Sequence, residues 1–307
     1  MDLAIITAQQ VFILFILILA GYVCGKTGAI KIEYKKPLSD LLIYLVVPAM
    51  VINSYMREFD KSAFNNLLQA FALSFVMLIA GLIVTMAVTW KMKSSDKSIF
   101  RFACIFSNAA YMGFPLIRAM FGEEGILYAS AFLTVYNILL WTVGYGMVSG
   151  KVHLREVIHS IVTCPVIIAV IIGLVIYIGG IHIPDVISTP VGNIGDMNTP
   201  VSMIITGLTI AGSDMKKLIR NKRLFGIIGL RMFVIPVICF ALLYVFNIRG
   251  MVPMVIVVLE ACPTAAITTM FAIQFKHNED LAAGAVVFTT LISIVTLPLY
   301  TLLAAMI

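Results

Sequence analysis

Two stretches of the sequence place small, polar and helix-breaking residues in the middle of long apolar runs. They read SNAAYMGFPLIRAMFGEEG over residues 107–125 and LEACPTAAITTMF over residues 259–271. Proline suits the first position of a helix, where its missing N–H needs no partner. Pro115 and Pro263 are therefore each interpreted as the start of a half-helix that follows a short unwound segment. Such starts present free N–H groups and partial positive charge, and two of them together would favour an anion.

The residues that flank the two breaks are candidates for contact with a bound anion. They are Asn108, Gly113, Phe114 and Pro115 in the first stretch and Cys262, Pro263 and Thr264 in the second. The alternative is that each proline makes a simple kink that neighbouring helices repair. Two prolines at matching places in the two halves of the chain favour a binding site over a pair of kinks.

The composition indicates that these stretches lie in a membrane. Of the 307 residues 61% are hydrophobic and 12% are charged, and the mean hydropathy is +1.06, whereas soluble domains carry about 25% charged residues. The pI near 9.0 is attributed to cytoplasmic loop charge rather than to a nucleic-acid partner. The N-terminus lacks the basic segment of a signal peptide, so we expect an uncleaved first span there.

Apolar runs of about 20 residues, the length that crosses a bilayer as a helix, predict ten transmembrane helices. Sixteen of the 21 Lys and Arg residues fall in odd-numbered loops and three in even-numbered loops. This asymmetry places the odd loops in the cytoplasm and both termini on the other side of a cell (inner) membrane. The seventh span is expected to be interrupted or to enter at the interface. The predicted spans are residues 5–25, 38–56, 64–90, 99–121, 126–149, 158–180, 192–213, 223–247, 252–275 and 281–306.

The two broken spans, the fourth and the ninth, occupy equivalent places in two five-span units, residues 1–150 and 151–307. Five is an odd number, so the second unit must enter the membrane in the opposite sense. The predicted fold class is therefore an all-α polytopic membrane protein built from two inverted repeats, the plan of many secondary transporters. Because the repeats are inverted, the two breaks should meet and cross near the midplane.

Charged residues within the spans are further candidates, since such groups are costly in lipid and often functional. Glu260 is the one acid expected near the midplane, where it could carry a proton, pair with a cation or balance an arginine. Arg231 could pair with an acid or, the favoured interpretation, extend its side chain toward the cytoplasmic interface. Arg118 could attract a substrate carboxylate at the outer mouth, or pair with Glu123 or Glu124, and both alternatives stay open.

The run VYNILLW places Asn137 in the fifth span, where its amide would brace the adjacent break or contact a substrate. The five cysteines lie in apolar segments without a CxxC pair, and the four histidines lie in loops or at span ends without ligand spacing. We therefore predict no metal, no disulfide and no cofactor.

The motifs SNAAYMGFPLIRAMFGEEG, VYNILLW, EACPTAAITTMFAIQF and TTLISIVTLPL resemble the auxin efflux carrier family over essentially the whole chain. The short GKVHLREVIH segment between spans five and six is similar to compact, prokaryotic-type members. The resemblance implies the fold of bile-acid sodium symporters and sodium/proton antiporters. In it, spans one, two, six and seven form a scaffold, and spans three to five and eight to ten form a transport domain that moves like an elevator. It also implies a homodimer formed through the scaffold.

The resemblance also implies site residues. It carries a pocket role onto Asn108, Pro115, Asn137 and Pro263, and Tyr136 stands where plant exporters have glutamine. Tyr136, Arg118 and Glu260 are therefore candidates for gating or coupling. No clear counterpart exists here of the third-span carboxylate of some plant members.

Together these observations predict a secondary transporter of a small organic anion, a mono- or dicarboxylate. The resemblance implies a dicarboxylate such as malonate or malate, or an auxin-like acid. Its expected partners are that anion, membrane lipid and a second copy of the chain. The alternatives are a sodium/proton antiporter, a channel, or a membrane sensor that uses the same pocket. An intramembrane enzyme would need a nucleophile or metal set within the spans, and the sequence contains no such set.

Overall fold

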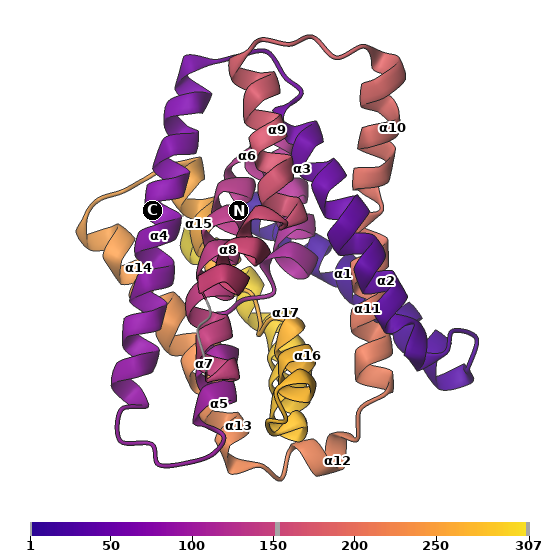
Figure 1. The fold of residues 1–307 in the computed structure, drawn as a ribbon, viewed down its shortest axis with the longest axis vertical. Helices are drawn as coiled ribbons and strands as arrows, with labels where there is room; N and C mark the ends of the chain where they lie inside the picture. The colour runs from indigo at the N-terminus through magenta and orange to yellow at the C-terminus, as the bar shows by residue number, and fades with distance from the viewer. Residues whose placement is uncertain (1, 151–153, 305–307) are drawn as a thin grey trace.

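A computed structural model describes residues 2–150 and 154–304, and its regular structure there is helical (Figure 1). Four of its helical segments are π-helical turns, η2 to η5, inserted between α-helices. The elements are α1 (Asp2–Thr27), η1 (Ile32–Tyr34), α2 (Lys35–Leu41), η2 (Leu42–Val46), α3 (Val47–Tyr55), α4 (Lys61–Val88), α5 (Lys97–Ile105), η3 (Ala109–Gly113), α6 (Phe114–Leu139), η4 (Leu140–Gly144), α7 (Tyr145–Ser149), α8 (Leu154–Val162), α9 (Pro165–Ile178), α10 (Asp185–Asp196), α11 (Asn198–Ala211), α12 (Met215–Leu218), α13 (Lys222–Gly229), η5 (Leu230–Val234), α14 (Ile235–Val245), α15 (Met251–Glu260), α16 (Ile267–Gln274) and α17 (Glu279–Ala304).

Six helical runs in the described residues are long and apolar enough to cross a membrane. This confirms an all-helical polytopic membrane protein, whereas ten crossings stay a prediction. One run, Ala109–Ser149, contains a break at Gly122, whose φ of 61° falls in the left-handed region that glycine tolerates. The remaining predicted spans coincide with shorter helices that are interrupted. The six runs are Gln9–Thr27, Ile32–Tyr55, Lys61–Val88, Ala109–Ser149, Lys222–Val245 and Glu279–Leu303.

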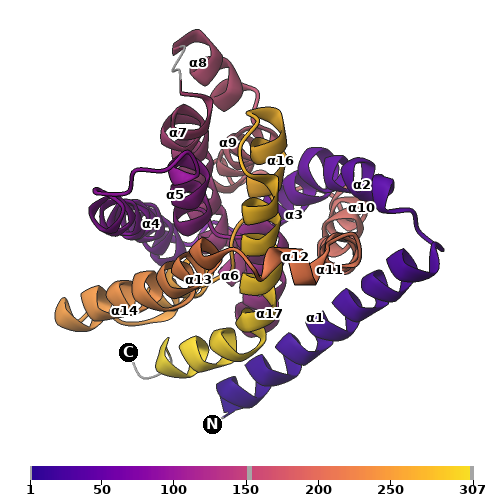
Figure 2. The same ribbon diagram turned by 90° about the horizontal axis from the view of Figure 1, so that it is seen from below.

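Helix α1 runs along one edge of the molecule and packs on α11 (Figure 2). The contact is made through glycines, because a Cβ on Gly207 would lie 2.1 Å from the Ile18 carbonyl oxygen and 2.5 Å from the Tyr22 nitrogen. A Cβ on Gly21 would lie 2.5 Å from the Ile204 carbonyl oxygen. Close backbone approach through small residues is the usual way in which helices associate in lipid.

Two further groups of helices pack closely. In one, α3 packs on α9 and α10; in the other, α4, α6 and α15 pack on one another. Figure 1 shows α4 along one side of the molecule and α10 and α11 along the other. The deepest part of the core comes from the second group, where residues 126–132 of α6 and residues 255–260 of α15 are almost completely buried. The core is thus built around residues of the predicted fifth span and of the first half of the broken ninth span.

Candidate functional site at the crossing of two interrupted helices

The two interruptions lie against each other. The first consists of residues 106–108, between α5 and η3, and the second of residues 261–266, between α15 and α16. They pair as a short antiparallel bridge between Ser107 and Thr264. The Asn108 N–H donates to the Pro263 carbonyl at 2.7 Å, and the Ala265 N–H donates to the Phe106 carbonyl at 2.9 Å. Two chain breaks far apart in sequence therefore share one hydrogen-bonded unit inside the core.

Neither proline begins a half-helix, and that part of the sequence interpretation is wrong. After the first break, helical structure begins at Ala109 with the π-turn η3, and Pro115 lies in the first turn of α6, which continues from it. After the second break α16 begins at Ile267, so Pro263 lies within the extended segment. The fixed φ of proline and its missing N–H suit a paired extended segment as well as a helix start, and spacing alone does not distinguish the two.

Pro115 has a different consequence. The Phe114 N–H bonds to the Ala109 carbonyl, and Pro115 has no N–H, so the Ala110 and Tyr111 carbonyls lose their partners within the helix. Side chains of α11 replace those partners. Ser202 donates to the Tyr111 carbonyl at 3.0 Å, and Asn198 donates to the Ala110 carbonyl at 3.4 Å. The proline thus creates a polar contact between η3 and α11.

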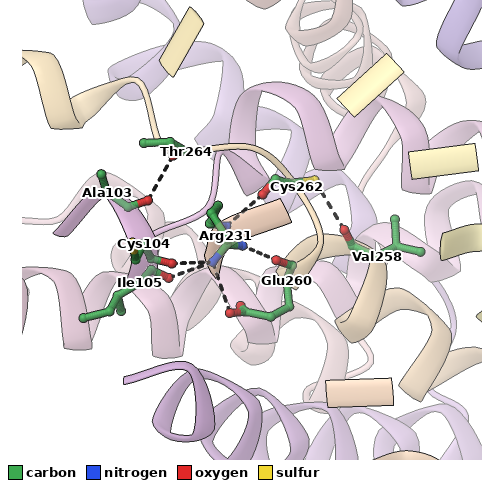
Figure 3. A network of polar contacts seen from close by, with 8 residues as sticks. All are labelled: Ala103, Cys104, Ile105, Arg231, Val258, Glu260, Cys262 and Thr264. Atoms are coloured by element: carbon green, nitrogen blue, oxygen red, sulfur yellow. Dashed lines mark hydrogen bonds and ion pairs between the residues drawn. The ribbon is translucent and has the colours of Figure 1, made fainter. Parts of the chain in front are cut away.

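Arg231, in the π-turn η5, lies at the centre of the crossing (Figure 3). Its side chain is completely buried, which contradicts the interpretation that it extends toward the membrane interface. It forms an ion pair with Glu260 at 3.3 Å, and its other hydrogen bonds go to backbone carbonyls at the ends of α5 and α15. A guanidinium with five donors satisfies several converging carbonyls at once, whereas at the interface it would leave them unpaired.

All four carbonyls of the last turn of α5 are satisfied. The guanidinium donates to those of Cys104 and Ile105, both at 3.1 Å. The Thr264 hydroxyl donates to the Ala103 carbonyl at 2.9 Å, and the Phe106 N–H donates to the Phe102 carbonyl at 3.1 Å. The C-terminal end of this half-helix is therefore closed by protein groups, as Figure 3 shows for Arg231 and Thr264.

The last turn of α15 is closed in the same way. Arg231 donates to the Glu260 carbonyl and, at 3.0 Å, to the Cys262 carbonyl just beyond the helix. The Cys262 thiol donates to the Val258 carbonyl at 3.4 Å, and its N–H donates to the Leu259 carbonyl. The Ala261 N–H donates to the Val257 carbonyl. Both negative helix ends are thus saturated, and one arginine serves both.

The N-terminal ends of the half-helices differ. In the described residues, no backbone or side-chain acceptor pairs with the N–H groups of Ala109, Ala110 and Tyr111 at the first or of Ala266 and Ile267 at the second. Buried hydroxyls without a partner in the same part of the chain lie beside them or on the adjacent α17. These are Ser107 Oγ, Thr268 Oγ1 and Thr290 Oγ1. The crossing therefore offers unused hydrogen-bond donors at the N-terminal, positive ends of its half-helices. At the C-terminal, negative ends, the carbonyls of the last turns of α5 and α15 are already bonded.

A small apolar cluster covers the N-terminal, positive ends of the half-helices. Leu42 and Val46 of η2 and Ile205 of α11 form it with Tyr111, and Ala110 and Ala266 pack against it. The crossing is closed to solvent in this conformation, because Ser107 is 1% exposed and Asn108 7%. Access to the free N–H groups requires η2 and α11 to separate from the half-helices.

Several predicted site residues hold the crossing together. Both hydrogen-bond donors of Thr264 are used, since its N–H donates to the Thr289 hydroxyl and its own hydroxyl donates to the Ala103 carbonyl. A Cβ on Gly113 would lie 2.5 Å from a Leu259 methyl group, so glycine there allows η3 to approach α15. Phe114 and Pro115 are buried beside it.

In the described residues the Asn108 side chain has no hydrogen-bond partner, and that of Asn137 donates to the Leu133 carbonyl of its own helix at 2.7 Å. Tyr136 reaches the first break, its ring 5.5 Å from that of Phe106, measured between centroids. Glu260 directs one carboxylate oxygen at Arg231, and its other oxygen is buried without a partner in the described residues.

Arg118 pairs with Glu123 and with Asp196 of α10, both at 2.5 Å. The first contact is one of the two alternatives that the sequence left open. Asn53 of α3 donates to Glu123 at 3.4 Å, so this polar group joins α6 to α3 and α10.

The sequence did not predict that Arg231 lies at the centre of the crossing. It also did not predict that Asn198 and Ser202 bond to the carbonyls freed beside Pro115. The signals were present: an arginine deep in an apolar run, and polar residues within the irregular TPVGNIGDMNTPVSM segment, residues 189–203. What they contact depends on helices distant in sequence.

The structure combines apolar helices of membrane length with two interrupted helices that pair at their breaks. This combination defines a polytopic membrane protein of the kind found among transporters. The sequence profile of a family described as Membrane transport protein matches residues 6–163 and 151–301. The chain therefore belongs to this family, the auxin efflux carrier family. It is 24% identical over 301 residues to an uncharacterized transporter of Methanothermobacter thermautotrophicus, covering 96% of this chain and 97% of that protein. It is equally similar, at 24% over 307 residues, to an uncharacterized transporter of Methanocaldococcus jannaschii, covering 96% and 98%.

Proposed function

We propose that this membrane transport protein is a secondary transporter of a small organic anion, a mono- or dicarboxylate such as malonate or malate. The observation that carries the proposal is the asymmetry of the crossing. The C-terminal ends of both half-helices are saturated by protein groups, whereas the N-terminal ends keep free N–H groups in a buried setting. Free N–H groups at helix starts favour anions.

The anion would lie between the half-helix starts and the cluster of η2 and α11. The N–H groups of residues 109–111 and 266–267 would donate to its oxygens, with Asn108 supplying a side-chain amide. The remaining proposed site residues shape and hold this space. They are Gly113, Phe114, Pro115, Asn137, Cys262, Pro263 and Thr264.

The proposed architecture is ten spans in two inverted units, residues 1–150 and 151–307. The packing groups support a division into two parts, because α1 packs on α11 and α3 on α9 and α10, whereas α4, α6 and α15 pack together. The first part would be the scaffold, through which two copies pair, and the second the elevator-like transport domain in a cell membrane. The proposed binding space lies where the two parts meet.

The nearest rival function is a sodium/proton antiporter, which needs a carboxylate free to bind cations. Glu260 is the one acid at the crossing among the described residues, and it is paired with Arg231. A membrane sensor would use the same pocket without moving its ligand across the membrane, so only a flux measurement separates it from a carrier.

Uptake of labelled malonate and malate into proteoliposomes tests the proposal. The wild type is expected to accumulate one of them, and Asn108→Ala is expected to lose about tenfold or more of the flux, as for a lost hydrogen bond to a charged group. The matched control is Asn65→Ala, on the exposed face of α4. Absence of carboxylate flux in the wild type, or undiminished flux in Asn108→Ala, would contradict the proposal.

Pro115→Ala restores an N–H that can bond to the Tyr111 carbonyl and so competes with Ser202. We expect slower malonate or malate flux, because η3 becomes regular helix and its contact with α11 weakens. The same vesicles report the flux, and Pro298→Ala in α17 serves as the control for removing a proline from within a helix. Equal flux in Pro115→Ala and the wild type would show that this contact has no role in transport.

Asp196→Asn removes the charge that links α10 to Arg118 of α6. The carboxylate is 61% exposed, so the pair contributes at most about 1 kcal/mol, and we expect the thermal midpoint to stay close to wild type. If the contact joins the moving part to the fixed part, its loss raises flux by up to about fivefold. Glu33→Gln, which breaks the exposed Lys31–Glu33 pair within one segment, is the control and should leave flux unchanged.

A further inference from the structure

We propose that Arg231 takes the place of a coupling cation, so that transport requires no sodium. This inference rests on the proposed function, and it assigns to one side chain the task that other carriers with broken helices give to a bound ion.

The ligands around Arg231 are those of a cation site. In transporters with interrupted helices, unwound carbonyls and half-helix C-terminal ends coordinate the coupling ion. Here four carbonyls, of Cys104, Ile105, Glu260 and Cys262, and one carboxylate oxygen of Glu260 converge on a single guanidinium. Five oxygens from two helix ends would suit a small hard cation. Their place for a cation is already taken by the Arg231 guanidinium, which is covalently part of the chain.

The position of Arg231 is fixed by its own helix. Pro236 follows in the first turn of α14 and has no N–H for the Met232 carbonyl four residues before it. Tyr300 of α17 donates to that carbonyl at 2.5 Å instead. This bond stabilises the π-turn η5 from which Arg231 extends into the crossing, and the Arg231 side chain is completely buried.

The guanidinium would also move with the site. Its acceptors lie at the ends of α5 and α15, and η5 packs on α5, so all belong to the part proposed to move. A bound sodium ion must be released and rebound in each cycle, whereas this charge is retained. The cation side of the crossing is thus permanently filled, and only the anion side exchanges its ligand.

The first test compares wild-type flux of labelled malonate or malate in sodium, potassium and choline media of equal ionic strength. We expect the same rate in all three, within about twofold. A rate that falls about tenfold or more when sodium is withdrawn overturns the inference but leaves the proposed function intact. Absence of carboxylate flux in every medium refutes the proposed function, and the second test then decides the inference by itself.

The second test measures thermal unfolding in detergent and needs no substrate. Sodium chloride is expected to leave the wild-type midpoint where choline chloride leaves it, and stabilisation by sodium overturns the inference. Arg231→Ala is expected to unfold at lower temperature and to regain stability in millimolar guanidinium chloride, which can refill the site. Arg249→Ala, which removes an exposed arginine bonded to Asn247, is the control and should not respond. If Arg231→Ala does not fold, the wild-type comparison of sodium with choline still gives the answer.

Discussion

Replacing Arg231 with leucine is expected to lower the free energy of unfolding by about 3–5 kcal/mol, the range for breaking one side of a buried ion pair. The guanidinium donates to four backbone carbonyls and to Glu260, and all of these groups are buried. Leucine cannot donate to any of them, so a charge and the ends of two helices lose their partners in a medium that supplies no water.

Thermal unfolding in detergent and the fraction of monodisperse protein after purification measure this loss. The double variant Arg231→Leu/Glu260→Leu is expected to recover part of the stability, because it removes the unpaired carboxylate but not the unpaired carbonyls. Glu260→Gln keeps an acceptor for Arg231 and should lower the free energy of unfolding less than the single or the double leucine variant does. An unchanged midpoint in the single leucine variant would mean that Arg231 does not hold the crossing together.

The second large effect is expected for Gly207→Ala on α11. The added methyl carbon would lie 2.1 Å from the Ile18 carbonyl oxygen and 2.5 Å from the Tyr22 nitrogen, both in the backbone of α1. A side chain could rotate away, but backbone can only shift as a helix. We expect α1 to separate from α11 and the protein to lose about 3 kcal/mol, the upper part of the usual range for overpacking.

The control for this substitution is Gly229→Ala on α13, where the added carbon has no atom within 4 Å apart from its chain neighbours and the backbone of its own helix. Alanine has a higher helix propensity than glycine, so this variant should be as stable as wild type or more stable, by about 0.5–1 kcal/mol. Thermal unfolding of both variants in the same detergent decides the matter. If Gly207→Ala unfolds at the wild-type midpoint, the close packing of α1 on α11 is refuted.

The membrane class and the regions of the two breaks could be predicted from the sequence, because they depend on local chemistry. Apolar runs as long as a bilayer is thick specify helices in lipid, and Pro115 and Pro263 mark where a regular helix cannot be completed. The family likeness carried by the same motifs is confirmed by the profile match over both halves of the chain. Free N–H groups near these breaks also follow from the geometry of any helix start.

What the sequence could not decide was how the groups freed by each break find their partners. Proline removes a donor wherever it stands, so its presence does not tell whether it begins a helix, as predicted, or lies in a paired extended segment, as Pro263 does. An arginine in an apolar run can reach for the interface or turn inward, and the choice depends on which acceptors surround it. Only the tertiary structure brings the ends of α5 and α15 together around Arg231, because their carbonyls lie more than a hundred residues apart in the chain and close on one side chain.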